Sequence, residues 1–157
     1  MKGEPATASG AIREAREGDL EALLPLLRAY CDFYEASPSD DGLLRMARGV
    51  IAAPQDEAFL LVCTDDHDEV VGFAACAWKW SSLRGGRIVV LDDLYVAEAA
   101  RGRGHADALI EATAEVARRH GGQVVTWLTA PDNHRAQAVY NRVGGHAETF
   151  LEYELEL

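Results

Sequence analysis

The sequence lacks the long apolar runs that would place it in a membrane. Nowhere in its 157 residues does an apolar stretch approach the roughly 18 residues that a transmembrane helix needs. The first residues are small and polar, without the apolar segment of a signal peptide. We therefore expect a cytoplasmic protein without a membrane partner.

Cysteine and histidine are too few and too scattered to indicate a metal site. The three cysteines, Cys31, Cys63 and Cys76, form no CxxC pair, and the five histidines form no HExxH pattern. Cysteines that are odd in number and far apart are typical of free thiols in a reducing compartment. We expect no metal ion. None of the three cysteines stands beside a candidate base in the sequence, so none is a convincing covalent nucleophile.

Positive charge is also scarce. Lys and Arg number 15 against 26 Asp and Glu, which gives a net charge of −11. A nucleic-acid-binding protein needs a basic surface for the phosphates, so we expect no such partner. The acidic field favours a cationic substrate. The same charge also serves solubility, and the sequence leaves both explanations open.

The chain is predicted to form one domain. Its length is sufficient to bury a core, and neither an internal repeat nor a linker rich in Gly, Ser or Pro divides it. Residues 1–10 (MKGEPATASG) lack apolar periodicity, which indicates a loose leader. The domain is therefore predicted to span residues 11–157.

Apolar spacing predicts two helices in the first half, after a short strand at 11–15. Asp19 is expected to cap the first helix, which runs to about Tyr34. One stripe of this helix is apolar: Leu20, Leu23, Leu24, Leu27, Tyr30 and Cys31. The second helix follows the break at 37–40 and ends near Pro54.

Strands and helices alternate through the rest of the chain. Strands are predicted at 59–64, 70–80, 87–96, 124–129 and 147–157, and helices at 104–120 and 133–143. The acidic turn between the first two of these strands indicates a solvated hairpin tip. The alternation implies a mixed α/β sheet with helices packed on it.

A loop rich in glycine and arginine (RGRGHA, 101–106) is the first candidate site. Glycine lets a backbone approach a ligand closely, and the first amides of the following helix have no partner within it. The helix dipole adds partial positive charge at the same place. Such a loop is typical of a cradle for an anion.

Two further segments contain polar side chains in unusual settings. Asp92 and Asp93 interrupt an apolar strand, and a carboxylate in partly apolar surroundings has a raised pKa and can act as a base. Neighbouring strand residues face opposite sides, so we expect different roles for the two. Asn133 and Tyr140 share one helix face about 10 Å apart, where they could line a long ligand. Structural roles remain an alternative for all four.

Together these three segments resemble the GNAT (Gcn5-related N-acetyltransferase) superfamily. The family signature Gln/Arg-x-x-Gly-x-Gly/Ala is matched at 101–106, and the strand LDDLYV and the helix NHRAQAVYNRVGG lie in the family's order. The resemblance covers 12–157 and is greatest to the small histone and polyamine acetyltransferases of fungi and their bacterial relatives. It implies an α/β (α+β) GNAT fold, with about four helices around a mixed sheet of about six or seven strands. The sheet is expected to splay at its fourth strand, after a bulge near Leu94 to Val96.

The resemblance also implies acetyl-CoA as co-substrate and direct acetyl transfer to an amine. Asp92 is implied as the base, acting through a water molecule, and Tyr140 as the acid that protonates the CoA thiolate. A strand amide near Val96 is implied to stabilise the oxyanion. The residues implied in binding acetyl-CoA are Leu94, Tyr95, Val96, Arg101, Gly102, Arg103, Gly104, His105, Ala106, Asn133, Ala136 and Tyr140.

The expected acceptor is the primary amine of a small cation: a polyamine, a diamine or a lysine-like compound. Asp93 is implied near the bound amine, and Tyr34, Glu35 and Trp80 are candidates for the pocket walls, because aromatic rings and carboxylates suit a cation. Arg84 stands in a loop where polyamine enzymes carry acidic residues, which weakens the polyamine case.

Other functions stay open. The chain could acetylate a protein lysine or N-terminus, or it could be a non-catalytic acyl-CoA-binding sensor in which Asp92 and Tyr140 are dispensable. The family also implies a homodimer, with the tail at 150–153 as a candidate interface.

Overall fold

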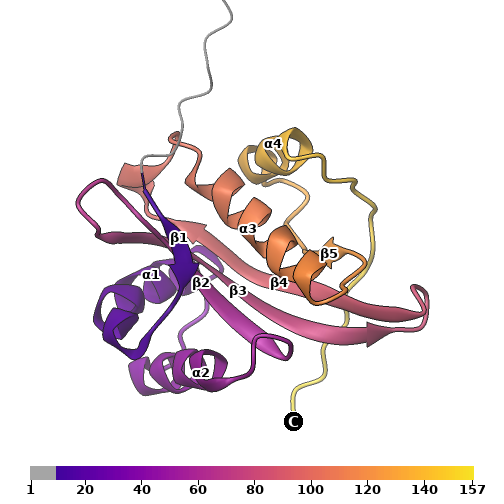
Figure 1. Ribbon diagram of the computed structural model, residues 1–157, viewed down its shortest axis with the longest axis horizontal. Coiled ribbons are helices and arrows are strands. Elements are labelled where there is room, and N and C mark those ends of the chain that lie inside the picture. The colour runs from indigo at the N-terminus through magenta and orange to yellow at the C-terminus, as the bar shows by residue number, and fades with distance from the viewer. Residues whose placement is uncertain (1–9) are drawn as a thin grey trace, which may run out of the picture.

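A computed structural model describes residues 10–157, so nearly all of the predicted leader lies outside the described residues. Five strands form a single sheet in the order β1-β2-β3-β4-β5 (Figure 1). The strands are β1 (Ile12–Glu14), β2 (Ala58–Thr64), β3 (Val70–Ser81), β4 (Gly86–Val96) and β5 (Val125–Thr126). The helices are α1 (Leu20–Phe33), α2 (Asp40–Ala52), α3 (His105–Arg119) and α4 (His134–Arg142), with short 3-10 turns η1 (Glu17–Asp19) and η2 (Glu98–Ala100).

The sheet is mixed, as predicted. Strands β1 to β4 pair antiparallel, each with the next. Strand β5 pairs parallel to β4 through only two residues, opposite Val89 and Val90. Beyond Val90, β4 therefore continues without a parallel neighbour within residues 10–157, and the sheet splays at its fourth strand.

The strand count is lower than the predicted six or seven. Strand β5 is shorter than the predicted 124–129, and the segment 147–157, predicted to be a strand, has no strand pairing. A strand needs a neighbour to satisfy its backbone, and the apolar side chains of this segment lie exposed instead of packing on the sheet. The alternating pattern at 147–157 was therefore not sufficient to predict a strand within the single chain.

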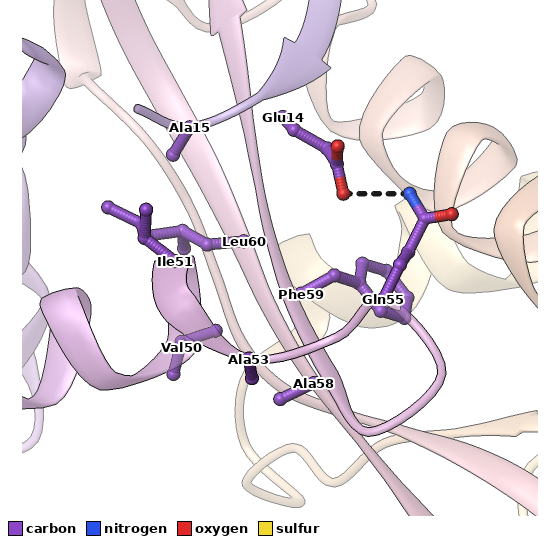
Figure 2. Close-up of a pocket in the computed structure, with 9 residues that line it drawn as sticks. All are labelled: Glu14, Ala15, Val50, Ile51, Ala53, Gln55, Ala58, Phe59 and Leu60. Carbon is purple, nitrogen blue, oxygen red and sulfur yellow. Dashed lines mark hydrogen bonds between the residues drawn. The ribbon is translucent and has the colours of Figure 1, made fainter. Parts of the chain in front are cut away.

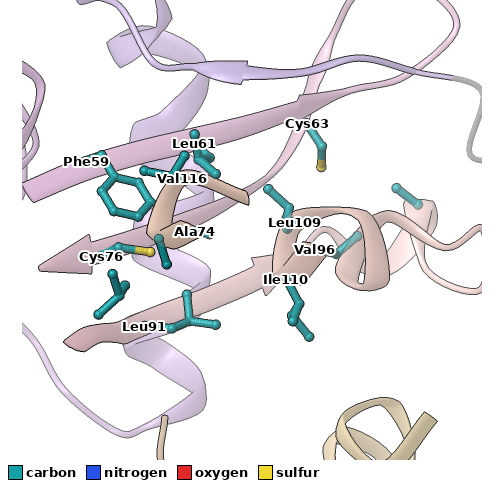
Figure 3. Packing of buried hydrophobic residues seen from close by; sticks show 13 residues of the cluster. Phe59, Leu61, Cys63, Ala74, Cys76, Leu91, Val96, Leu109, Ile110 and Val116 are labelled. Atoms are coloured by element: carbon teal, nitrogen blue, oxygen red, sulfur yellow. The ribbon is translucent and has the colours of Figure 1, made fainter. Parts of the chain in front are cut away.

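Helices cover both faces of the sheet, with α1 and α2 on one side and α3 on the other (Figure 1). Strand β2 shows why: Phe59 and Leu61 pack in the cluster under α3, whereas Leu60 and Val62 pack in the cluster under α1 and α2. Figure 3 shows the cluster under α3. An uninterrupted apolar strand of this kind is the pattern of a strand buried on both faces.

Asp19 has a different role from the predicted cap of α1. Its carboxylate accepts hydrogen bonds from the Arg13 guanidinium at 2.7 and 2.8 Å and from the Arg16 amide at 2.7 Å, and it makes no capping bond to the helix. The Arg13 hydrogen bond holds the pKa of Asp19 below its ordinary value. This pair ties β1 to the start of α1.

Helix α4 is attached more loosely than the others. None of its residues is fully buried, and it is held to α3 by a bidentate ion pair between Arg142 and Asp107 at 2.9 and 2.7 Å.

Among the helices of residues 10–157, none combines the length and apolar character needed to cross a bilayer.

Candidate active site

A bulge places Asp92 outside the regular pairing of the sheet. Ala75 of β3 lies opposite Asp93, but its neighbour Cys76 lies opposite Leu91. Asp92 is therefore the extra residue of β4. The predicted bulge near Leu94 to Val96 was placed too late in the strand. Because a bulge bends a strand and redirects its side chains, simple alternation does not describe the two aspartates.

The end of β4 and the following loop are fixed by Arg101. Its Nε donates to the carbonyl oxygen of Val96 at 2.9 Å, and its guanidinium lies 5.4 Å from the centre of the Tyr95 ring. This side chain, predicted to bind acetyl-CoA, thus joins the loop to the strand. Direct contact of Arg101 with a phosphate stays a prediction.

The glycine loop has the backbone geometry of an anion site. Gly102 and Gly104 adopt φ angles of +78° and +83°, a left-handed conformation that favours glycine. A side chain added at Gly102 would meet no atom within 4 Å, so the space in front of the loop is open. His105 and Ala106 begin α3, where backbone amides have no partner within the helix. The loop therefore fits a diphosphate group.

Asn133 and Ala136, both predicted to bind acetyl-CoA, form a hydrogen bond with each other at the start of α4. The Oδ1 atom of Asn133 accepts a hydrogen bond from the Ala136 amide at 3.2 Å. This is an N-cap, which satisfies one of the free amides at the start of the helix. The side-chain nitrogen of Asn133, Nδ2, takes no part in this cap. Contact of Asn133 with a ligand stays a prediction.

A small cavity lies beside Asp92, between elements from both faces of the sheet. Its walls come from α1, β4, the chain after β5, and α4: Tyr30, Tyr34, Leu91, Asp92, Leu94, Trp127, Leu128 and Tyr140. The structure thus brings together four residues singled out from the sequence: Tyr34, Asp92, Leu94 and Tyr140. Its volume is about 20 Å³, little more than a single water molecule requires.

Four wall residues were missed from the sequence: Tyr30, Leu91, Trp127 and Leu128. The Trp127 ring meets the Tyr140 ring edge-on, with centres 5.4 Å apart. Tyr30 was assigned to the apolar stripe of the first helix. Its hydroxyl could have indicated a further role, because a half-buried phenol usually has a hydrogen-bond partner.

Partial loss of hydration shifts the pKa of the two candidate catalytic groups. Asp92 is exposed, and the partial burial of its carboxyl raises the pKa above its ordinary value, which makes the carboxylate a better base than one in water. Burial, followed by the proximity of Tyr34, raises the pKa of Tyr140. Tyr140 is therefore protonated at neutral pH and can donate its proton.

Two predicted wall residues are not part of this cavity. Trp80 lies toward the far end of β3, is 79% exposed, and faces the Arg87 guanidinium at 5.9 Å. Glu35 follows α1 with a φ of +55° and is exposed. Trp80 lies opposite Arg87 of β4 and does not line this cavity, and its contact with an acceptor stays a prediction.

The larger cavity of the molecule lies elsewhere. It has a volume of about 200 Å³ and is enclosed by residues of β1, β2 and the end of α2 (Figure 2). Its polar side chains are Glu14 and Gln55, joined by a hydrogen bond of 2.8 Å. With neither a nearby acid–base pair nor the glycine loop, it lacks the chemistry found at Asp92.

The sequence model of the acetyltransferase (GNAT) family matches residues 21–145. The chain belongs to this family. An uncharacterized N-acetyltransferase of Bacillus subtilis is 27% identical over 147 residues, which are 93% of this chain and 97% of the relative. The thialysine N-epsilon-acetyltransferase of Bos taurus is 29% identical over 150 residues, 90% of this chain and 86% of that enzyme.

A yeast enzyme and a crystal structure extend this agreement. The D-amino-acid N-acetyltransferase HPA3 of Saccharomyces cerevisiae is 37% identical over 83 residues, 53% of this chain and 52% of that enzyme. The crystal structure of a probable acetyltransferase superimposes with a TM-score of 0.81 at 28% identity, covering 94% of this chain and 97% of the other. The fold is the GNAT fold, and the protein is an acetyl-CoA-dependent N-acetyltransferase.

The described residues offer no obvious metal centre: within 10–157, three or more His, Cys, Asp or Glu side chains nowhere gather in a group that could hold an ion. The glycine loop, by contrast, fits the diphosphate of acetyl-CoA. Its open front, its left-handed glycines and the free amides of α3 are all properties of the backbone.

Proposed function

We propose that this acetyltransferase modifies the primary amine of a small cationic compound, by direct attack of the amine in a ternary complex. The observation that most supports this is the cavity lined by both Asp92 and Tyr140, beside the part of β4 that has no parallel neighbour. A proton acceptor and a proton donor thus line the same cavity. Residues 11–157 are proposed to act as one domain.

Asp92 is proposed to remove the proton of the acceptor. An alkylammonium group with a pKa of about 10 is mostly protonated at neutral pH and cannot attack a carbonyl in that form. The Asp92 carboxylate lines the cavity and has a raised pKa. The ammonium proton passes to this carboxylate through a water molecule, and the amine nitrogen keeps the electron pair with which it forms the new amide bond.

Tyr140 is proposed to complete the exchange. Bound acetyl-CoA supplies an acetyl group activated as a thioester. As the carbon–nitrogen bond forms and the carbon–sulfur bond breaks, the Tyr140 hydroxyl gives its proton to the leaving sulfur. The nitrogen then loses its second proton to the Tyr140 oxygen, which leaves a neutral amide, a CoA thiol and a protonated Tyr140. Amides near Val96, in the part of β4 that has no parallel neighbour, stabilise negative charge on the carbonyl oxygen. The glycine loop orients the donor, and this orientation contributes to the rate.

The composition of the cavity favours a small cation as acceptor. Its walls combine three tyrosines, one tryptophan and one carboxylate with leucines, and they contain no Lys, Arg or His. Aromatic faces and carboxylates attract an ammonium group. The support comes from this composition and not from the size of the cavity, since about 20 Å³ holds little more than one water molecule.

CoA thiol release is the experiment that tests this proposal. The panel comprises spermidine, short diamines, lysine analogues, aminoglycosides and a lysine-rich peptide. Turnover with a small cation supports the proposal and identifies the acceptor class. Turnover with the peptide alone would replace it with protein acetylation. Acetyl-CoA binding without turnover on any member would contradict it and favour the sensor function.

A homodimer is proposed from the exposed tail. Five apolar residues within 150–157 are at least 77% exposed in the single chain: Phe150, Leu151, Tyr153, Leu155 and Leu157. Such a group favours burial against a partner. Light scattering of the full-length protein and of a chain ending at Gly145 tests this; a monomeric full-length protein would contradict it. The cytoplasmic location stays a prediction.

A further inference from the structure

The hairpin formed by β3 and β4 extends beyond the rest of the sheet (Figure 1). Strand β2 pairs with β3 only as far as Ala77. The next residue, Trp78, donates its amide to the carbonyl oxygen of Glu57 at 2.9 Å, and residues 79–81 pair with β4 alone. Within residues 10–157, this edge of β3 therefore has no strand beside it.

The tip of this hairpin, residues 79–87, is basic and apolar in a protein of net charge −11. Its sequence KWSSLRGGR contains three cations and no Asp or Glu. Trp80 is 79% exposed and Leu83 is 99% exposed. Lys79 and Arg84 are also exposed, and no ion pair of residues 10–157 includes either of them. The tip thus presents two large apolar side chains and two cations to the solvent.

The segment 147–157 has the complementary composition. Its sequence AETFLEYELEL contains four Glu and no Lys, Arg or His, and its five large apolar side chains are exposed. From Leu151 onward, apolar residues alternate strictly with glutamates. In an extended conformation this segment carries apolar side chains on one face and carboxylates on the other. The tip and the tail are both exposed in the single chain, so they do not cover each other there.

We propose that the segment 147–157 of one copy adds to the free edge of β3 in a second copy, as an extra strand beside residues 79–81. This inference rests on the homodimer of the proposed function and identifies the surface that binds the tail. Each copy has one hairpin and one tail. The two copies therefore exchange tails reciprocally about a twofold axis, which closes the assembly at two chains.

The alternation of side chains agrees between the two segments. Lys79 and Trp80 are neighbours in β3 and point to opposite faces of the hairpin. On the Trp80 face, the Arg87 guanidinium lies 4.3 Å from the centre of the Trp78 ring and 5.9 Å from that of Trp80. The apolar row of the tail packs on this face, and its glutamates lie on the other face, beside Lys79. Apolar pairs and opposite charges on adjacent strands both stabilise a sheet.

The lysine also favours this particular strand over others. A lysine on an edge strand discourages pairing with most extended segments. A segment whose row of glutamates falls on the same face as Lys79 is the kind that the edge accepts. The charges therefore select the tail of a second copy of this acidic chain.

Charge reversal tests the contact. Lys79→Glu with Arg84→Glu makes the tip acidic, and Glu152→Lys with Glu154→Lys makes the tail basic. Each of these double variants should raise the Kd of the dimer at least about 100-fold, because like charges then face each other at both contacts. Arg45→Glu, a reversal at an exposed residue of α2, is the control and should leave the Kd within about twofold. Sedimentation over a concentration series measures the Kd.

A mixture of the two double variants provides the decisive measurement. Each acidic tip then meets a basic tail and each basic tip an acidic tail, so an equimolar mixture should form a heterodimer with a Kd within about tenfold of the wild type. A monomeric wild type, a dimer that persists in either variant, or a mixture that stays monomeric would overturn the inference. Circular dichroism establishes that each variant is folded.

CoA thiol release separates this inference from the proposed acetylation. Amine turnover by a wild-type protein that is monomeric would support acetylation and reject the tail contact. A dimer with the expected charge dependence that acetylates no amine of the panel would support the tail contact and reject the proposed acceptor.

Discussion

The glycine loop and the cavity proposed to bind the acceptor both adjoin the second half of β4 but are built in opposite ways. The loop is a contiguous segment, 101–106, and its geometry is a property of the backbone, with two glycines at positive φ before the free amides of α3. The cavity is assembled from side chains of α1, β4, α4 and the chain after β5.

This contrast separates recognition of a common donor from recognition of a particular acceptor. Backbone groups bind a diphosphate whatever the surrounding side chains are. Side chains from distant elements can change one at a time, and with them the shape and charge of the cavity. Substitutions on the acceptor side should therefore alter chemistry or amine binding, and substitutions in the loop should alter acetyl-CoA binding.

Tyr140→Phe should give the largest effect. Loss of the proton donor is expected to lower kcat about 1,000-fold, while the Kd for acetyl-CoA stays nearly constant because the ring still packs on Trp127. Single-turnover kinetics together with calorimetric titration of acetyl-CoA measure the two quantities. Full activity of the Phe variant would remove Tyr140 from the mechanism.

Asp92→Asn should come next, with kcat/KM for the amine lowered about 100-fold at neutral pH. Burial raises the Asp92 pKa in the folded state, so the charge of Asp92 costs stability as pH rises through and above that pKa. The Asn variant should therefore unfold at higher denaturant concentration than the wild type at pH 7.

The stability difference has a defined pH dependence. It should shrink as pH falls from the raised pKa of the folded state through the ordinary Asp pKa, and disappear below it, where wild-type Asp92 is neutral in both states. Denaturant unfolding at several pH values measures it. An Asn variant that retained wild-type turnover would exclude Asp92 as the base, whatever its stability.

Gly102→Ala should act only on the donor side. The residue has a φ of +78°, and Gly85, in the β3–β4 turn, has a φ of +62°; an added Cβ meets no atom within 4 Å at either position. Both Ala variants therefore carry a similar backbone strain of about 1 kcal/mol. We expect Gly102→Ala to raise the KM for acetyl-CoA about tenfold and Gly85→Ala to leave it unchanged. Equal KM values for the two variants would place the donor's phosphates elsewhere.

Tyr34→Ala and Trp80→Ala should give the smallest effects and should differ from each other. Tyr34 lines the cavity, so its removal should raise the amine KM about fivefold, in the range of a lost cation–aromatic contact. Trp80 packs against Arg87 far from the cavity, so its removal should leave the amine KM within about twofold. Steady-state kinetics at saturating acetyl-CoA measure both. A large effect of Trp80→Ala on the amine KM would support the prediction that Trp80 lines the acceptor pocket.

The sequence predicted best what depends on neighbouring residues. The helices, the first four strands and the loop at 101–106 follow from apolar spacing, glycine and helix starts within short windows. The place of Asp92 in the sheet does not, because it depends on how Ala75 and Cys76 of another strand pair with β4. Tyr30 was assigned to the core for a similar reason, since its hydrogen-bond partner, the carbonyl oxygen of Asp92, lies 62 positions further along the chain.

The segment 147–157 also shows that a local pattern does not determine pairing with a distant strand. Its alternation of apolar residues with glutamates predicted a strand at 147–157, and the local pattern is clear. Pairing requires a neighbouring edge as well as a suitable sequence, and within the single chain these residues have no strand pairing and lie exposed.

The bulge also has a consequence for how such an enzyme can change over time. Residues 86–91 pair with β3 in one register and residues 93–96 in another, and Asp92 is the residue that neither register uses. Loss of this one codon would remove the proposed base and could leave a continuous ladder of strands on both sides of the gap. Descendants could then keep the scaffold while losing the chemistry. A one-residue gap at this point of an alignment would identify such members more directly than overall similarity.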